Sequence, residues 1–221
     1  MNVLAVGAHW DDIEIGCALS LQRLRGRGAK LFGAVLTDSD YVVAADGHMR
    51  ESAAARAEGL RVFEKLGVQH ARTTVLPNLS MRYDQRVMQE LEAIVEDHCI
   101  DMVFTHWFGD HNTDHAATWE ISRVAFRRVG NLLQYQSNAY FDNVSSFVSH
   151  LYFGFTEEQY QWKKSLLAMH ETEWGYREAR WKREIFDRER FWGFQAGSDY
   201  AESFMISRLR DTGSFGLFPA R

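Results

Sequence analysis

A histidine and two aspartates stand together near the start of the chain, directly after an apolar run. The run covers residues 3–8 and leads into His9-Trp10-Asp11-Asp12. An imidazole beside two adjacent carboxylates is costly to hold where a strand ends, unless a cation lies among them. The cluster therefore favours a metal site.

A second cluster of the same chemical kind follows a later apolar run at 102–104. Residues 105–115 read Thr-His-Trp-Phe-Gly-Asp-His-Asn-Thr-Asp-His. Catalytic zinc sites use three protein ligands and leave a position for water, and a His/Asp/His set suits this ion. His9 and Asp12 lie three residues apart at a predicted strand-to-helix turn, and His115 would complete the set.

Asp11 is left over from this ligand set. A free carboxylate beside a metal-bound water can accept its proton as hydroxide attacks a carbonyl that the metal polarises. Such a site hydrolyses an amide or an ester without a covalent intermediate. Taken alone, Asp11 or Asp12 could instead cap the following helix, and His115 could be a surface histidine. The two clusters together favour the metal site.

Strand and helix patterns alternate through the first two thirds of the sequence. We predict strands at 3–8, 30–37, 73–76, 101–105 and 132–136, and helices at 13–25, 49–66, 85–98 and 114–127. This pattern predicts a Rossmann-like α/β fold, with a mainly parallel sheet and helices on both faces. In a doubly wound sheet the first and fourth strands are commonly neighbours. The two clusters are then expected to meet at the carboxyl ends of those strands.

The last third contains two long helical patterns, 157–172 and 177–191, and many aromatic residues. Four tryptophans there are typical of terminal helices packed on a core rather than of a ligand platform: Trp162, Trp174, Trp181 and Trp192. We expect one domain over 1–221, because this length suits a single core. Residues 1–137 would form the Rossmann-like core, and 138–221 would add C-terminal strands and helices packed on it.

The composition narrows the possible partners and the compartment. The net charge of −5 provides no electrostatic footprint for nucleic acid. Cys17 and Cys99 lack CxxC spacing, which fits a reducing compartment. No apolar run approaches the length of a membrane span, and no leader pattern precedes the first strand. We expect a cytoplasmic protein without membrane insertion, and a homo-oligomer stays possible.

These motifs resemble those of the PIG-L/LmbE-type metal-dependent deacetylases, which remove acetyl groups from N-acetylglucosamine-like sugars. Their opening signature, Ala-His-Pro-Asp-Asp and then an acidic residue, is similar to Ala-His-Trp-Asp-Asp-Ile-Glu at 8–14. Their second signature ends in Asp-His within a His- and Asp-rich loop, as at 105–115. Their Arg-Glu helix ending in Leu-Gly resembles 50–67, and their Ala-Glu-x-Phe stretch is similar to 201–204. The resemblance spans roughly residues 2 to 208.

The resemblance implies a zinc-dependent N-deacetylase, with another divalent cation possible. His9, Asp12 and His115 would bind the metal, and Asp11 would be the general base toward a metal-bound water. The implied substrate is a small N-acetylated amino sugar or glycoconjugate. Two rivals stay open. The site could cleave a different amide, such as a thiol-sugar conjugate. A non-catalytic sugar- or nucleotide-binding module is disfavoured, because no GxGxxG follows the first strand.

Two positions are expected to shape the substrate side of the site. Trp10 replaces the usual Pro of the family, which adds a large ring beside the metal; ordinary packing of the indole is the alternative. Arg50, from the Arg-Glu helix, is a second candidate substrate contact.

The main departure from the family concerns the residue that would act as the acid of the reaction. Many members carry a His three residues before the ligand His, where this chain has Asn112, a candidate substrate contact. His106 and His111 are the possible substitutes as oxyanion stabiliser or proton donor, and His106 is favoured slightly. Asp114 would orient the acting imidazole or cap the next helix. Asp11, once protonated, could instead deliver the proton itself.

Overall fold

The computed structural model describes residues 1–138, 146–177 and 179–210. Its strands are β1 (Asn2–Gly7), β2 (Lys30–Val35), β3 (Tyr41–Val42), β4 (Met49–Arg50), β5 (Val68–His70), β6 (Met102–His106), β7 (Asn131–Tyr135), β8 (Leu151–Phe155) and β9 (Tyr200–Arg208). Its helices are α1 (Asp12–Gly26), α2 (Ser52–Leu66), α3 (Gln85–Asp97), α4 (Thr113–Ala125), α5 (Glu157–Leu167), α6 (Glu171–Trp174) and α7 (Ala179–Ala196).

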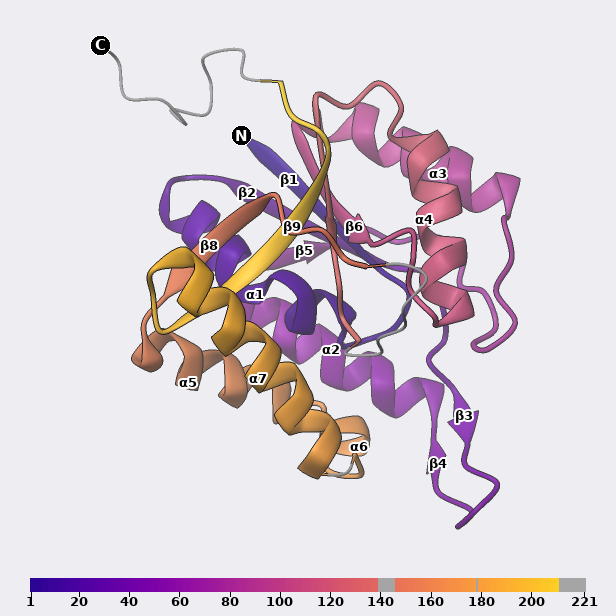
Figure 1. Ribbon diagram of the computed structural model, residues 1–221. Coiled ribbons are helices and arrows are strands. Elements are labelled where there is room, and N and C mark those ends of the chain that lie inside the picture. The colour runs from indigo at the N-terminus through magenta and orange to yellow at the C-terminus, as the bar shows by residue number, and fades with distance from the viewer. Residues whose placement is uncertain (139–145, 178, 211–221) are drawn as a thin grey trace.

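Seven strands form one mixed sheet in the order β5-β2-β1-β6-β7-β9-β8 (Figure 1). The first five in this order run parallel, and β9 and β8 are antiparallel additions at one edge. A separate hairpin of β3 and β4 projects from the body of the molecule. The predicted α/β architecture is confirmed.

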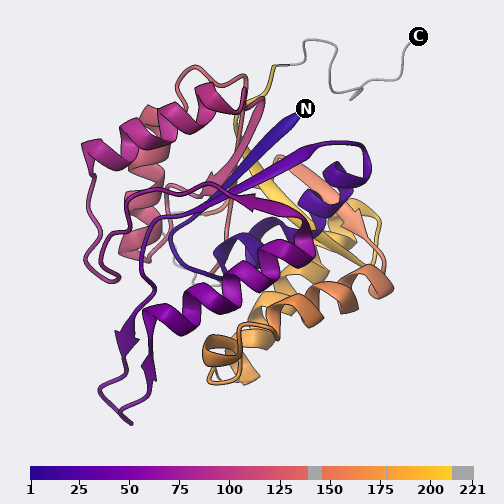
Figure 2. The same ribbon diagram turned by 180° about the vertical axis from the view of Figure 1, so that it is seen from behind.

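Helices cover both faces of the sheet because its inner strand β1 is apolar on both sides. Val3 and Ala5 of β1 face one core with α1 and α2, whereas Leu4 and Val6 face a second core with α3 and α4. Figures 1 and 2 show α3 and α4 on one side and α1, α2, α5 and α7 on the other. A strand buried on both faces reads as a continuous apolar run, which is the pattern at 3–8.

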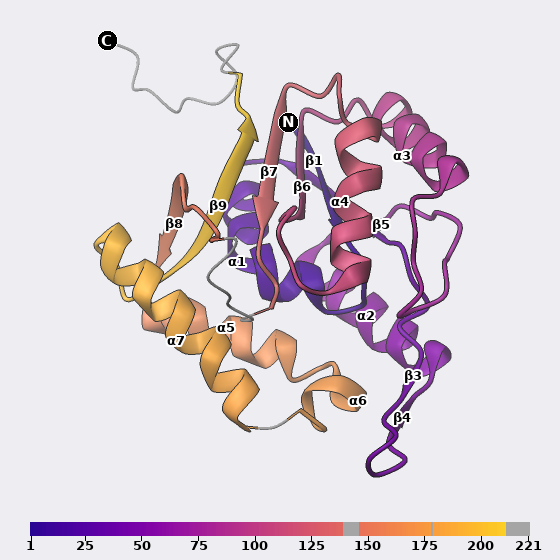
Figure 3. The ribbon, with the colours of Figure 1, turned by 45° about the vertical axis from the view of Figure 1, so that its right-hand side comes forward.

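The strand order brings the two polar clusters to the same edge of the sheet. β1 pairs with β6 in parallel, with Val3 opposite Met102 and Ala5 opposite Phe104. The two strands lie side by side in Figure 3 and end in the same direction. The expected adjacency of these strands is confirmed, and it places the residues after β1 beside those after β6.

Two expected elements were wrong. No strand forms at 73–76: the third strand of the alternation is β5, and only a single bridge joins Thr37 to Leu76. The chain turns at Gly67 in a left-handed conformation (φ 71°) and pairs with β2 at once, so the later β-branched run lies beyond the sheet. The helix expected at 157–172 is two helices, because tight turns at 168–170 end α5 before α6 begins.

Helix α1 is interrupted at Cys17, whose backbone is not helical (φ −152°, ψ 17°). The break leaves amide groups of the next turn without helical partners. The carboxylate of Glu202 on β9 accepts the N–H of Leu19 at 3.0 Å and that of Ser20 at 2.7 Å. A glutamate from the end of the chain therefore caps the second half of the first helix.

Lys163 on α5 completes this buried network. Its ammonium donates to the carbonyl of Ile15 at 2.7 Å and to Glu189 and Glu202 at 2.8 Å each. All three charged side chains are at most 1% exposed. The network joins α1, α5, α7 and β9, so the C-terminal elements fix the helix that begins at the first polar cluster.

None of the helices in the described part of the chain combines the length and apolar composition of a membrane span.

Candidate functional site

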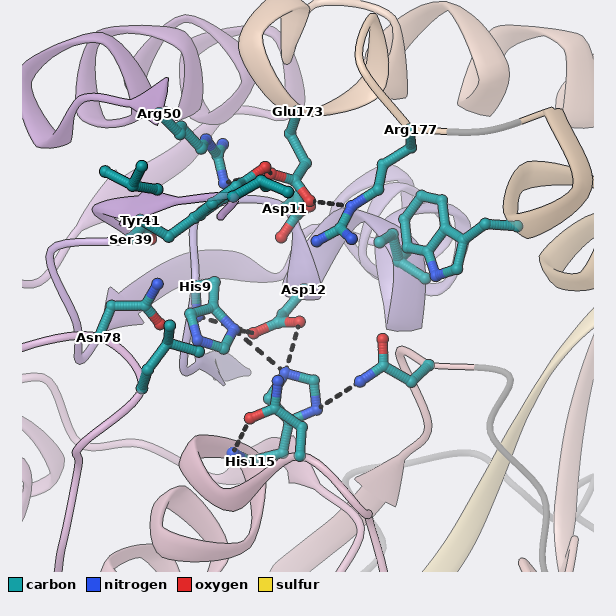
Figure 4. Close-up of a pocket in the computed structure, with 17 residues that line it drawn as sticks. His9, Asp11, Asp12, Ser39, Tyr41, Arg50, Asn78, His115, Glu173 and Arg177 are labelled. Atoms are coloured by element: carbon teal, nitrogen blue, oxygen red, sulfur yellow. Dashed lines mark hydrogen bonds and ion pairs between the residues drawn. The ribbon is translucent and has the colours of Figure 1, made fainter. Parts of the chain in front are cut away.

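Three side chains converge where β1 and β6 end. Nδ1 of His9 lies 3.1 Å from Nε2 of His115. The two carboxylate oxygens of Asp12 lie 3.2 Å from these nitrogens, Oδ2 from Nδ1 of His9 and Oδ1 from Nε2 of His115. A tetrahedral zinc with bonds of about 2.1 Å separates its ligand atoms by roughly 3.4 Å. The donor types and their spacing therefore fit a divalent cation, with the open side toward a cavity (Figure 4).

Each imidazole of this triad is oriented by a second carboxylate. Nε2 of His9 lies 3.2 Å from Asp114, which also accepts backbone N–H groups from the loop at 79–81. Nδ1 of His115 lies 3.0 Å from Asp110. Such outer carboxylates fix the tautomer of a ligating histidine. They leave Nδ1 of His9 and Nε2 of His115 directed at the same point.

The triad attracts positive charge. Burial opposes protonation of His9, but the charge of Asp12 and hydrogen bonds to Asp114 and Asp12 raise its pKa to about 10. Burial likewise opposes protonation of His115, and the charges of Asp12 and Asp110 raise its pKa to about 9. Although burial disfavours its charge, His115, His106 and His9 hold the pKa of Asp12 well below its usual range. The carboxylates around this point are thus arranged to stabilise a cation.

Asp11 stands beside the triad without joining it. Its side chain makes no helix-capping hydrogen bond, and its backbone has the strained φ of 154°. Burial and the charge of Glu173 raise its pKa to about 7, against the opposing charge of Arg50. The carboxyl group lines the cavity and changes protonation near neutral pH, as a group that accepts and returns a proton must.

The cavity above the triad has a volume of about 270 Å³. This is near the lower end for small-molecule sites, roughly 300–1,000 Å³, so it suits a unit the size of one sugar. Its walls come from segments within 9–15, 39–43, 78–79, 112–115 and 173–181, with Arg50 and Asn138. Residues that are far apart in the sequence therefore line the same cavity.

Glu173 organises the wall opposite the triad. Its carboxylate accepts the hydroxyl of Tyr41 at 2.6 Å, lies 3.4 Å from Nη1 of Arg50 and accepts Nε of Arg177. Arg50 is only 2% exposed, and its Nη2 donates to the Trp10 carbonyl at 2.9 Å. Arg50 thus ties the loop of the first cluster to α6.

Comparison with known proteins is consistent with this geometry. The model of the PIG-L family, described as GlcNAc-PI de-N-acetylase, matches residues 4–126, more than half of the chain. The chain belongs to the PIG-L family. The family is one of deacetylases, so its chemistry is the hydrolytic removal of an acetyl group.

Individual relatives agree with this PIG-L membership. An uncharacterised deacetylase of Escherichia coli (strain K12), YaiS, is 27% identical over 176 residues, which is 77% of this chain and 91% of the relative. The N,N'-diacetylchitobiose deacetylase from Pyrococcus horikoshii has a similar structure, with a TM-score of 0.73 and 16% identity over 93% of this chain and 83% of that chain. The A40926 pseudoaglycone deacetylase Dbv21 has a TM-score of 0.71 and 17% identity over 95% of this chain and 98% of that chain. The two structures show that the fold is shared.

The structure places Trp10, the departure from the PIG-L signature, in the core. Its indole is 4% exposed and packs against Phe63 and His70, with ring centroids 5.4 and 5.3 Å away. A Cβ at Gly59 would lie 2.1 Å from the indole, so α2 approaches the ring closely. The side chain faces α2 and β5 rather than the cavity over the triad. This position supports the packing alternative and not the expected substrate contact.

The two histidines that were candidate acids lie outside the cavity. His106 is fully buried behind Asp12, where its Nε2 accepts the amide of Ala8 at 3.0 Å. Burial and the charge of His115 lower its pKa to about 4. His111 is exposed on the loop. Neither placement supports a direct role in proton transfer.

Asn112 takes the capping task that was one alternative for Asp114. The side-chain oxygen of Asn112 accepts the N–H groups of Asp114 and His115 at 2.9 and 3.3 Å, so Asn112 caps α4 while lining the cavity. Asp114 lies 3.2 Å from Nε2 of His9, so it orients a predicted metal ligand rather than either of the histidines predicted to act as the acid.

Sequence reasoning missed Asp110 as the partner of His115, although it lies in the second cluster. It also missed three cavity residues, Tyr41, Glu173 and Arg177. The last three occur in a polar loop and in an aromatic-rich helical region without a motif. An acidic residue five positions before the ligand His was the one available signal, for Asp110.

Proposed function

We propose that this protein is a zinc-dependent N-deacetylase that releases acetate from an N-acetylated amino sugar or glycoconjugate. The convergence of His9, Asp12 and His115 beside an uncommitted Asp11, in a sugar-sized cavity, carries the proposal. Two structural relatives, a diacetylchitobiose deacetylase and a pseudoaglycone deacetylase, support the substrate class.

In this proposal His9, Asp12 and His115 hold the ion. When bound, zinc polarises the acetyl carbonyl and lowers the pKa of water. Asp11 accepts the proton of the attacking water, because its raised pKa makes it a competent base near neutral pH. Asp11 then returns that proton to the departing amine, since Asn112 stands where many relatives carry a histidine. Acetate and a free amine are the products.

The same proposal includes a cytoplasmic enzyme in which 1–221 acts as one domain. Cys17 and Cys99 are both free thiols, as expected in a reducing compartment. One hydrophobic core contains residues from β1 to β9, including Val3 and Phe204, which supports a single folding unit.

Acetate release from a panel of N-acetylated sugars, nucleotide sugars and glycosides tests the proposal. The purified protein should hold stoichiometric zinc and release acetate in a reaction that a chelator stops. Asp11→Asn should keep the zinc and lose at least about 100-fold in kcat, the usual scale of general acid–base catalysis. Asp12→Ala should lose the metal as well.

Asp187→Asn is the matched control, because this aspartate is exposed on α7, away from the cavity. It should behave like the unaltered protein. Acetate release that survives Asp11→Asn unchanged, or a panel with no metal-dependent acetate release, would contradict the proposal.

A further inference from the structure

Arg177 holds a guanidinium group on the cavity wall opposite the triad. The side chain is 37% exposed, and Figure 4 shows its terminal nitrogens directed into the cavity, on the side facing Asp12 and His115. The group lies 5.3 Å from the ring centroid of Trp181 and 5.8 Å from that of Tyr41. Two aromatic rings and one carboxylate thus hold it in place.

The hydrogen-bonding capacity of this guanidinium is only partly used. Its Nε donates to Glu173, and within the ranges that the structure describes no hydrogen bond of its two terminal nitrogens is found. Glu173 also serves Tyr41 and Arg50, so its charge is shared among three donors. The other arginine of the cavity, Arg50, is 2% exposed and is paired with Glu58 and Glu173. Arg177 is therefore the arginine that can meet a ligand.

We propose that Arg177 determines specificity by binding an anionic substituent, a carboxylate or a phosphate, on the N-acetylated sugar. This inference rests on the proposed deacetylase function and adds the substrate class to it. A guanidinium presents two parallel N–H groups that match the oxygens of either anion. The acetamide would lie at the triad and Asp11, and the anion at Arg177 across the cavity. The volume of about 270 Å³ suits one sugar with a small charged group.

Three matched compounds test the inference: the methyl glycoside of N-acetylglucosamine, its carboxymethyl glycoside, and N-acetylglucosamine 1-phosphate. They differ in charge at one position. The zinc-loaded protein should process at least one anionic compound with a kcat/KM about 10- to 100-fold above the neutral one, the usual effect of a hydrogen bond to a charged group. The anionic compound with the higher kcat/KM shows whether the preferred anion is a carboxylate or a phosphate.

Arg177→Met should remove this preference. Arg177→Lys should keep part of it, because lysine retains the positive charge but lacks the two parallel N–H groups of the guanidinium. The ratio between anionic and neutral compounds is the deciding quantity, since loss of the Glu173 pair would lower both rates alike. Arg183→Met is the control: this arginine is exposed on α7 and away from the cavity. It should leave the ratio unchanged. An equal loss for charged and neutral compounds in Arg177→Met, or no preference in the unaltered protein, overturns the inference.

Direct binding separates this inference from the deacetylase proposal. Calorimetric titration of the zinc-loaded protein with the same compounds should show tighter binding of the preferred anion and its loss in Arg177→Met, whether or not acetate is released. Equal binding of all three compounds refutes the role of Arg177 even if acetate release is observed.

Discussion

Replacing Lys163 by Met should destabilise the fold strongly, although this residue lies outside the candidate site. The ammonium is 0% exposed and contacts Glu189, Glu202 and the Ile15 carbonyl, each within 2.8 Å. Methionine fills a similar volume but supplies no charge. Two buried carboxylates and one carbonyl would then face one another without a cation between them.

Removing one partner of a buried ion pair lowers the free energy of unfolding by about 3–5 kcal/mol, and this is the cost expected for Lys163→Met. For a domain of this size each kcal/mol lowers Tm by about 2–4 °C, so the shift should be roughly 6–20 °C. Adding Glu189→Gln to Lys163→Met removes one of the two stranded charges and should recover part of the loss. Glu202 is kept because it also caps α1.

The stabilising contribution of Lys163 depends on pH in a definite direction. Burial opposes the charge of Lys163, but Glu189 and Glu202 raise its pKa above the usual value in the folded protein. Its stabilising contribution is therefore complete below the unfolded pKa of about 10.5 and is lost as pH rises through the folded pKa. The melting deficit of Lys163→Met should therefore shrink as pH rises from about 7 to about 11, because the unaltered protein then loses the contribution of the charged ammonium.

Thermal denaturation by circular dichroism at pH 7 and at about pH 11 measures these effects. Lys65→Met, on the exposed side of α2, is the control and should melt within about 2 °C of the unaltered protein, as surface substitutions usually do. A Lys163→Met variant that melts like this control, or whose deficit grows at about pH 11, would refute the reasoning.

Three further predictions follow from the site. Asp114→Asn should weaken zinc binding about 10- to 100-fold, because Asp114 orients His9; competition with a chromogenic chelator measures this, and unchanged affinity would remove its orienting role. Asn112→Ala should cost about 1 kcal/mol through loss of the α4 cap, measured by urea denaturation, and a neutral result would contradict the capping assignment. Trp10→Phe should lower stability by about 1–3 kcal/mol by leaving a cavity beside Gly59, while KM stays unchanged; a large rise in KM would return Trp10 to the substrate site.

The sequence predicted a strand correctly where its local hydrophobic pattern was clear, and misplaced a strand where the pattern was short. The run at 3–8 is apolar without alternation, which is the pattern of a strand buried on both faces, and β1 is such a strand. The third strand was misplaced because β5 has only three residues, too short for a periodic signal. The Thr-rich run beyond it has strand propensity, but hydrogen bonds to β2 are made by 68–70 first. Pairing, not propensity, decided this element.

The sequence alone was enough to predict a metal triad of His9, Asp12 and His115 with Asp11 beside it, because the ligand types and their positions after strands are local properties. It could not show the direction of Trp10, since packing against α2 depends on a helix fifty residues away. It could not show that Glu173 and Arg177 reach the cavity, because their helical segment carries no motif and comes to the site only through the tertiary fold. Reactive residues at the ends of strands can be recognised from local sequence motifs. The residues that form the cavity walls come from distant segments, so only the tertiary structure shows which they are.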